Sequence, residues 1–157
     1  MSDFIKKCRV CDSGNLVPFF DLGEHPLANS LLASPNEKEN SYPLALAWCP
    51  NCNLVQLNYT VEPKILFSHY VWVTGTSKGA QDFSEKFYEA LVARTENPKN
   101  SYVLEIASND GTFLKPFKRD GYKVLGVDPA ENVAAIAEES GIPTKALFWN
   151  KETALQV

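Results

Sequence analysis

The sequence lacks the features that mark export, membrane insertion and binding to nucleic acid. Its first residues contain no apolar segment of a secretion signal, and no apolar run approaches the roughly 18 residues that cross a bilayer. Lysine and arginine number 15 against 19 aspartate and glutamate residues, for a formal charge of −4. There is thus no basic excess to follow a phosphate backbone. We therefore expect a cytoplasmic protein whose partners include neither a membrane nor a nucleic acid.

Cysteine is scarce, but its spacing is informative. The four cysteines form two pairs, Cys8/Cys11 and Cys49/Cys52, with two residues inside each pair and 37 residues between the pairs. Two Cys-x-x-Cys pairs are typical of a closed tetrahedral zinc site. Two disulfides or a redox-active dithiol are the alternatives. The missing export signal disfavours disulfides, and the second matching pair disfavours a redox dithiol. Because four thiolates leave no open coordination position, we predict a structural Zn²⁺.

The pattern of apolar and turn residues predicts a small module and a connecting segment before any larger fold. Residues 1–62 are predicted to form a β-rich zinc-binding module with strands over Val17–Leu22 and Asn53–Leu57. A unit of this size buries little apolar area, so the metal would contribute to its folding free energy. Residues 63–100 are predicted to connect this module to the rest through an aromatic stretch and a helix over Lys78–Thr95.

Residues 101–157 alternate between strand and helix patterns and form the third predicted part. This βαβαβ order is typical of the first half of a Rossmann-like, doubly wound α/β sheet. The apolar run of its first strand predicts burial on both faces. One edge of that strand would be unpaired, so either the parent chain continues or two copies pair edge to edge. The predicted strands are Tyr102–Ala107, Lys123–Val127 and Thr144–Phe148, and the predicted helices are Thr112–Arg119 and Asn132–Ser140.

The turn after the first of these strands lacks the Gly-x-Gly-x-x-Gly fingerprint of dinucleotide-binding folds. Ala107 and Asn109 would hinder the close approach of a pyrophosphate, and Glu105 would repel it. The same acid suits a cationic ligand without phosphate, such as S-adenosylmethionine (SAM). Asp128 ends the second strand, where a carboxylate can accept both ribose hydroxyls. The alternatives are a solvated strand-end acid at Glu105 and a helix N-terminal acid at Asp128.

The segment Glu105-Ile106-Ala107-Ser108-Asn109-Asp110-Gly111 resembles motif I of class I SAM-dependent methyltransferases, with E-x-A-x-N-x-G in place of E-x-G-x-G-x-G. Together with the two cysteine pairs and the segments 22–29 and 67–77, this Asn-Asp-Gly variant resembles zinc-containing C-methyltransferases of nucleotide-linked deoxy-ketosugars. The resemblance covers essentially the whole chain. It implies SAM and Zn²⁺ as cofactors and a nucleotide-linked sugar as substrate.

The resemblance also implies how the reaction would proceed and where it would be incomplete. A base would remove a proton from the carbon next to a keto group, and that carbon would attack the methyl group. In such enzymes the base and most sugar contacts lie in a later part, so we expect this chain alone to be inactive, and no catalytic residue is assigned. A nucleic-acid methyltransferase with a zinc-ribbon reader and a non-enzymatic zinc-ribbon interaction module are the rival functions.

The loop and the resemblance together predict a cofactor site. Tyr70 and Ser77 are expected to close over the amino-acid end of SAM, and Phe148 packs either on the adenine or on the edge of the core. The predicted cofactor-binding residues are Tyr70, Ser77, Glu105, Ala107, Ser108, Asn109, Gly111, Asp128, Pro129 and Phe148.

Overall fold

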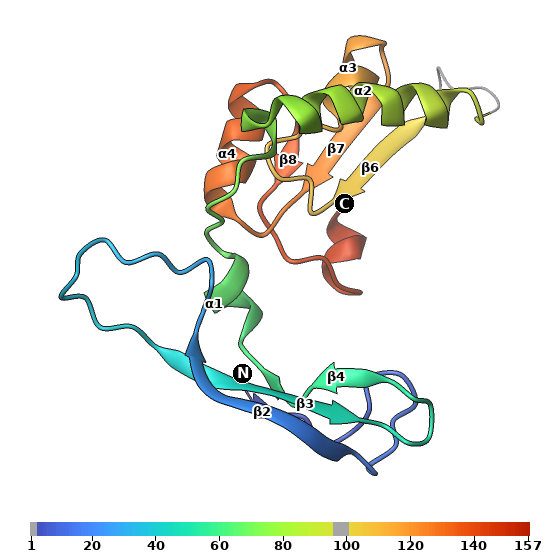
Figure 1. Ribbon diagram of the computed structural model, residues 1–157. Helices are drawn as coiled ribbons and strands as arrows, with labels where there is room; N and C mark the ends of the chain where they lie inside the picture. The colour runs from blue at the N-terminus through green and yellow to red at the C-terminus, as the bar shows by residue number, and fades with distance from the viewer. Residues whose placement is uncertain (1–2, 96–100) are drawn as a thin grey trace. The chain divides into compact units, whose positions relative to one another are not determined.

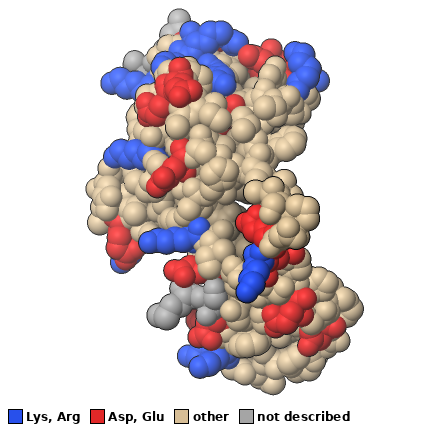
Figure 2. Space-filling model, turned by 90° about the vertical axis from the view of Figure 1, so that its left-hand side faces the viewer, with Lys and Arg blue, Asp and Glu red and all other residues tan. Residues whose placement is uncertain are grey.

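The computed structural model describes residues 3–95 and 101–157, and it divides into two compact units, Met1–Leu66 and Phe67–Val157 (Figure 1). The aromatic stretch and helix that were predicted as a connecting segment thus belong to the second unit. Across these described residues, no helix is long and apolar enough to span a membrane. On the face shown in Figure 2, basic and acidic side chains are interspersed.

The first unit is built from short antiparallel strands. One three-stranded sheet has the order β2-β3-β4, and a second, two-stranded sheet pairs β1 with β5. The bounds are β1 Asp3–Phe4, β2 Val17–Pro26, β3 Ser41–Trp48, β4 Val55–Leu57, β5 Tyr59–Thr60 and a short helix α1 Pro63–Phe67.

Strand β3 lies in the long gap between the cysteine pairs and was not predicted, because Pro43 interrupts the pattern. The structure tolerates this proline because β4 pairs only with Leu46–Trp48, so β3 has a single neighbour at Pro43. The prediction for β4 was wrong at its start. Asn53 has φ of 61° and belongs to the turn before the strand.

The second unit contains a parallel sheet of order β6-β7-β8, which confirms the predicted α/β class and its βαβαβ order. Helix α2 precedes the sheet, and α3 and α4 connect its strands (Figure 1). The bounds are 3₁₀ helix η1 Thr74–Thr76, α2 Lys78–Val92, β6 Tyr102–Ile106, α3 Lys115–Arg119, β7 Lys123–Val127, α4 Glu131–Glu139, β8 Thr144–Lys145 and 3₁₀ helix η3 Thr153–Gln156.

Three predicted elements of this unit are each three residues shorter than expected. Helix α2 ends at Val92 rather than Thr95. Helix α3 begins at Lys115 rather than Thr112, because the chain first turns through a hydrogen bond from the Leu114 N–H to the Gly111 carbonyl. Strand β8 ends at Lys145 rather than Phe148, because the Leu147 N–H folds back onto the Lys145 carbonyl.

The two faces of β6 differ in burial, which corrects the expectation of a strand buried on both faces. Val103 packs against the core cluster, whereas Tyr102, Leu104 and Ile106 are 57%, 36% and 50% exposed. Among the described strands, β6 pairs only with β7. Pairing of this edge between two copies stays a prediction. The core cluster comprises Tyr88, Leu114, Phe117, Tyr122, Val124, Ala137 and Ile142.

Candidate functional site

The four cysteines converge on one point in the first unit. All four sulfur atoms lie within 4.8 Å of one another. The Sγ atoms of Cys8 and Cys52 are 3.5 Å apart, and those of Cys11 and Cys49 are 3.6 Å apart. Ligands about 2.3 Å from a tetrahedral zinc ion are separated by about 3.8 Å, so this spacing fits Zn²⁺. It does not fit disulfides, whose sulfur atoms are about 2.05 Å apart.

Both cysteine turns use the same backbone geometry. In the first turn, the Cys8 N–H donates to Ser13 at 2.8 Å and the Asp12 N–H donates to the Cys8 carbonyl at 3.0 Å. The second turn repeats this pattern, because the Cys49 N–H donates to the Leu54 carbonyl and the Asn53 N–H donates to the Cys49 carbonyl, both at 2.8 Å. Asp12 and Asn53 occupy equivalent positions with φ of 56° and 61°. Asp and Asn tolerate this left-handed conformation, so the sequence itself favours two matching zinc knuckles.

Neighbouring side chains support this centre. A hydrogen bond from the Asn51 side chain, followed by one from the Ser13 backbone, lowers the pKa of the Cys11 thiol to about 6 and favours the thiolate that binds metal. Gln56 is 6% exposed, and its Oε1 accepts the Arg9 N–H at 3.0 Å. The side chain of Arg9, next to Cys8 in the sequence, donates from Nη2 to Thr60 Oγ1 at 2.8 Å. Gln56 was missed because nothing in its spacing relates it to the cysteines, and the hydrogen bond from Asn51 was missed because it joins the second cysteine pair to Cys11 of the first.

In the second unit, the loop after β6 turns sharply over the end of β7. Ala107, Asn109 and Gly111 have φ of 60°, 51° and 73°. The N–H groups of Ala107 and Ser108 both donate to the Val127 carbonyl, at 2.7 and 3.2 Å. The missing glycines therefore do not prevent the loop from adopting left-handed backbone at three alternate positions.

Asp128 fixes this loop from the end of β7. It is 7% exposed, and its two carboxylate oxygens each accept one backbone N–H. Oδ2 accepts from Asn109 at 2.8 Å, and Oδ1 accepts from Ala130 at 2.9 Å. Asp128 thus joins the two loops that follow β6 and β7. Its bond with Asn109 brings two of the predicted site residues into direct contact.

Ser108 and Gly111 are fixed by packing beneath the loop. Ser108 is 3% exposed, and its Oγ would lie 2.4 Å from a Cβ added to Gly126. A Cβ on Gly111 would lie 2.8 Å from Ile142 Cγ2. The Ser108 side chain is therefore directed into the protein, so only its backbone is available to a ligand.

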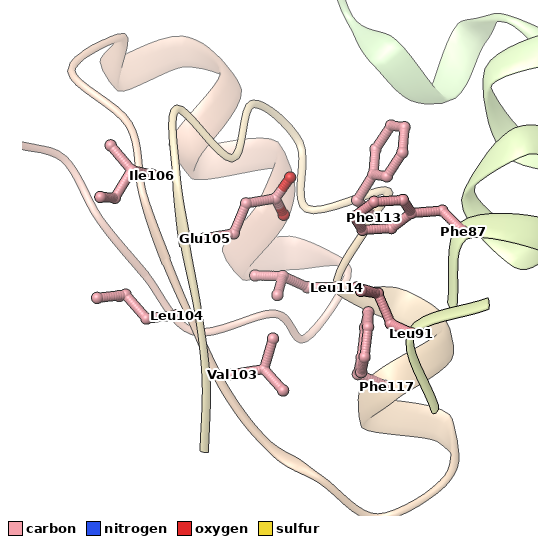
Figure 3. A pocket seen from close by; sticks show the side chains of 9 residues that line it. All are labelled: Phe87, Leu91, Val103, Leu104, Glu105, Ile106, Phe113, Leu114 and Phe117. Carbon is pink, nitrogen blue, oxygen red and sulfur yellow. The ribbon is translucent and has the colours of Figure 1, made fainter. Parts of the chain in front are cut away.

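Glu105 faces an apolar cavity of about 450 Å³ between β6 and the helices α2 and α3. Figure 3 shows Glu105 on the same side of β6 as Phe113, whereas Ile106 points to the other side. Within the described part of the chain, the buried Oε2 of Glu105 has no hydrogen-bond partner. Burial raises the pKa of Glu105 to about 7, and the nearby charges of Asp110 and Asp128 add to the rise. Glu105 is therefore not the solvated strand-end acid that was the alternative interpretation.

The segment before α2 reaches the same loops. The Tyr70 N–H donates to Asn132 Oδ1 at 3.0 Å, and the Thr74 N–H donates to Asn109 Oδ1 at 2.9 Å. Ser77 caps α2, with its Oγ accepting the Ala80 N–H at 3.3 Å. Asn132 was not predicted, because its partner lies 62 residues away in the sequence.

Two predicted residues, Pro129 and Phe148, lie at the margins of this region. Pro129 lies between the two residues linked by the Asp128 carboxylate and the Ala130 N–H. Phe148 lies beyond β8, where its carbonyl accepts the Thr153 hydroxyl at 2.7 Å. Their roles toward a cofactor stay predictions.

Comparison with known proteins bears on the zinc site and on the overall similarity of the chain. Residues 8–67 match a methyltransferase-associated family model described as "Putative zinc binding domain". The four cysteines thus form a zinc-binding site, as their geometry and this match agree. The chain is also 33% identical over 155 residues to the C-methyltransferase NovU of Streptomyces niveus, covering 98% of this chain and 37% of that protein. The predicted resemblance to zinc-containing C-methyltransferases is confirmed, for a chain that spans little more than a third of this relative.

Two solved structures give weaker matches. They are the magnesium protoporphyrin IX methyltransferase ChlM from Synechocystis PCC 6803 with bound SAM and with bound S-adenosylhomocysteine (SAH). Their TM-scores are 0.40 and 0.41, each at 19% identity. The matches cover 44% and 45% of this chain, and 37% and 36% of the ChlM chains.

Proposed function

We propose that this chain carries the zinc module and the cofactor-binding loops of a SAM-dependent C-methyltransferase. The observation that carries the proposal is the similarity to a C-methyltransferase over 98% of the chain. The left-handed loop at the end of β6 supports it, because such loops let a ligand approach the backbone at the carboxyl end of a parallel sheet. SAM, when bound, supplies the methyl group.

The residues of the loop would bind and orient this cofactor. Each Asp128 oxygen accepts one backbone N–H and keeps further lone-pair capacity, which would accept the ribose hydroxyls. Because Asp128 is 7% exposed, only a ligand placed directly on the loop could reach it. Glu105 would lie behind the loop and contribute less negative charge at neutral pH than an exposed carboxylate, since its pKa is raised to about 7.

Zinc would act in folding rather than in methyl transfer. Four thiolates complete a tetrahedral coordination sphere and leave no position for substrate. Among the residues of the first unit that the structure describes, few apolar side chains are buried besides the metal-binding cysteines, and these include Ala45 and Ala47. Metal binding would therefore contribute much of the stability of this unit.

We extend the proposal to the substrate class, a nucleotide-linked deoxy-ketosugar. The support is the Asn-Asp-Gly form of the loop and the similarity to a protein named as a C-methyltransferase. The keto group would acidify the neighbouring C–H, and removal of that proton would make the carbon nucleophilic. We assign the base to none of the residues in the described site, and we expect no turnover from these 157 residues alone.

Calorimetric titration tests the cofactor proposal directly. The zinc-loaded chain should bind SAH and SAM at one site and should not bind NADH in preference. Methyl transfer should then be measured on a panel of nucleotide-linked ketosugars, with this chain and with any longer product of its reading frame. Absence of SAM and SAH binding, or preferential binding of NADH, would contradict the cofactor proposal. Robust turnover by the 157-residue chain would instead contradict the assignment of the base elsewhere.

A further inference from the structure

The side chain of Asn109 is fully engaged with a distant stretch of backbone. Its Oδ1 accepts the Thr74 N–H at 2.9 Å, and its Nδ2 donates to the Trp72 carbonyl at 3.0 Å. The planar side-chain amide of Asn109 thus bonds to two consecutive peptide groups, through the carbonyl of Trp72 and the N–H of Thr74. We name residues 70–75, which contain both partners, the docked segment.

Two further side chains hold the ends of the docked segment. Asn132, from the start of α4, accepts the Tyr70 N–H at 3.0 Å and donates to the Tyr70 carbonyl at 2.8 Å. At the other end, Asp110 Oδ2 accepts the Gly75 N–H at 3.2 Å. A Cβ on Gly75 would lie 2.4 Å from that oxygen, so only glycine fits this approach. The docked segment is thus held at three points, by Asn109 and Asp110 of the loop that follows β6 and by Asn132 of the first turn of α4.

Asn109 occupies a motif position where glycine is usual, and its backbone does not require a side chain. Its φ of 51° is a conformation that glycine adopts without strain and that most other residues adopt at a cost. Glycine would serve the turn itself, and Asn also tolerates this conformation, so the role of the Asn109 side chain is given by its contacts and not by φ. The hydrogen bonds show what that side chain does, since both of its polar atoms are used on the docked segment.

We propose that Asn109 is a positioning residue that holds the docked segment as a preformed wall of the cofactor site, and that it acts on the cofactor through this segment. This inference rests on the proposed function for its ligand, but the docking itself does not. A wall fixed before binding lowers the ordering cost of association, so its release should weaken binding. The docked segment would then have the same position with and without bound ligand.

The test replaces Asn109 by the usual glycine. Asn109→Gly keeps the loop conformation available and removes only the amide. Amide hydrogen exchange, followed by NMR, should be faster at Thr74 and also at Gly75 and Tyr70, whose own acceptors are untouched. Affinity for SAH should fall roughly tenfold, the scale of the entropy cost of ordering about one backbone residue on binding.

Two companion variants keep the test decisive. Asn132→Ala removes the separate anchor at Tyr70 and should weaken SAH binding in the same direction, and it replaces Asn109→Gly if that variant does not fold. Asn15→Gly makes the same substitution at an exposed residue of the first unit and should leave SAH affinity unchanged.

The outcomes separate the two proposals. Faster exchange at Gly75 and Tyr70 together with weaker SAH binding supports the inference. Unchanged exchange at those two amides overturns the docking role, and faster exchange with unchanged affinity overturns the link to the cofactor. If the chain without substitutions binds no SAH, the proposed function fails, and so does the link from Asn109 to the cofactor. The exchange data still decide the docking role.

Discussion

Replacing Asp128 by alanine should destabilise the second unit and weaken cofactor binding together. The carboxylate is 7% exposed and accepts the Asn109 and Ala130 N–H groups, and alanine leaves both donors without that acceptor. A hydrogen bond to a charged group contributes about 1.5–3 kcal/mol, so two bonds amount to about 3–6 kcal/mol. Removing Asp128 also relieves its repulsion of Glu105, which offsets part of the loss. We expect the free energy of unfolding to fall by about 2–4 kcal/mol.

Urea unfolding at neutral pH, with an NMR probe in the sheet of the second unit, measures this change. Asp82→Ala is the matched control, because Asp82 is exposed and pairs only with Lys78 among the interactions described, a contact of small value. A loss below about 1 kcal/mol would refute the account of Asp128 as the residue that holds the loop. SAH affinity should fall by roughly 1–3 kcal/mol in the same variant. A destabilised variant with unchanged SAH affinity would show that the ribose is held elsewhere.

Three further predictions follow from the same geometry. Cys49→Ser should release zinc and unfold the first unit, while the amide spectrum of the separately compact second unit persists; loss of both spectra would contradict this. Ala107→Gly relieves the φ of 60° and should raise the free energy of unfolding by between zero and about 1 kcal/mol. Gly111→Ala should lower it by more than about 1 kcal/mol, because the new Cβ would meet Ile142. Urea unfolding of both variants measures these changes. Glu105 has a folded pKa raised to about 7 from 4.5, so its protonated form is favoured in the fold, and stability should decline as pH rises from about 4.5 through 7. Glu105→Gln should flatten that decline in urea titrations at pH 5 and pH 8, and an unchanged slope would exclude Glu105 as its source.

The zinc centre could be predicted from the sequence because its determinants are local. Two residues between cysteines suit one tight turn, and Asp12 and Asn53 supply the left-handed backbone that closes each turn. The start of β4 was misjudged for the same reason, since Asn53 serves the turn rather than the strand. The long gap could not be assigned, because β3 depends on pairing with β2 and β4 and its own pattern is broken by Pro43.

The order of elements in the second unit was also predictable, whereas the contacts of its loops were not. Alternating apolar runs and amphipathic stretches identify β6, β7, α2 and α4 within a few residues. The hydrogen bonds from the Tyr70 N–H to Asn132 and from the Thr74 N–H to Asn109 join residues 62 and 35 positions apart. No local pattern encodes such pairs. The apolar run at β6 likewise indicated burial on both faces, because sequence periodicity records the character of a strand and not the layers that cover it.

The loop after β6 shows why a missing glycine fingerprint need not abolish a ligand loop. Glycine serves such loops in two ways, by adopting positive φ and by leaving space for a close neighbour. Ala107 and Asn109 meet the first requirement, and their Cβ atoms need no space beneath the loop because Ala107 is exposed and Asn109 extends sideways to the docked segment. The second requirement is kept where it matters: Gly111 lies against Ile142, Gly126 against Ser108, and Gly75 against Asp110. Two of these three glycines lie outside the motif, so the space that the loop needs is provided partly by the strand and the segment that pack against it.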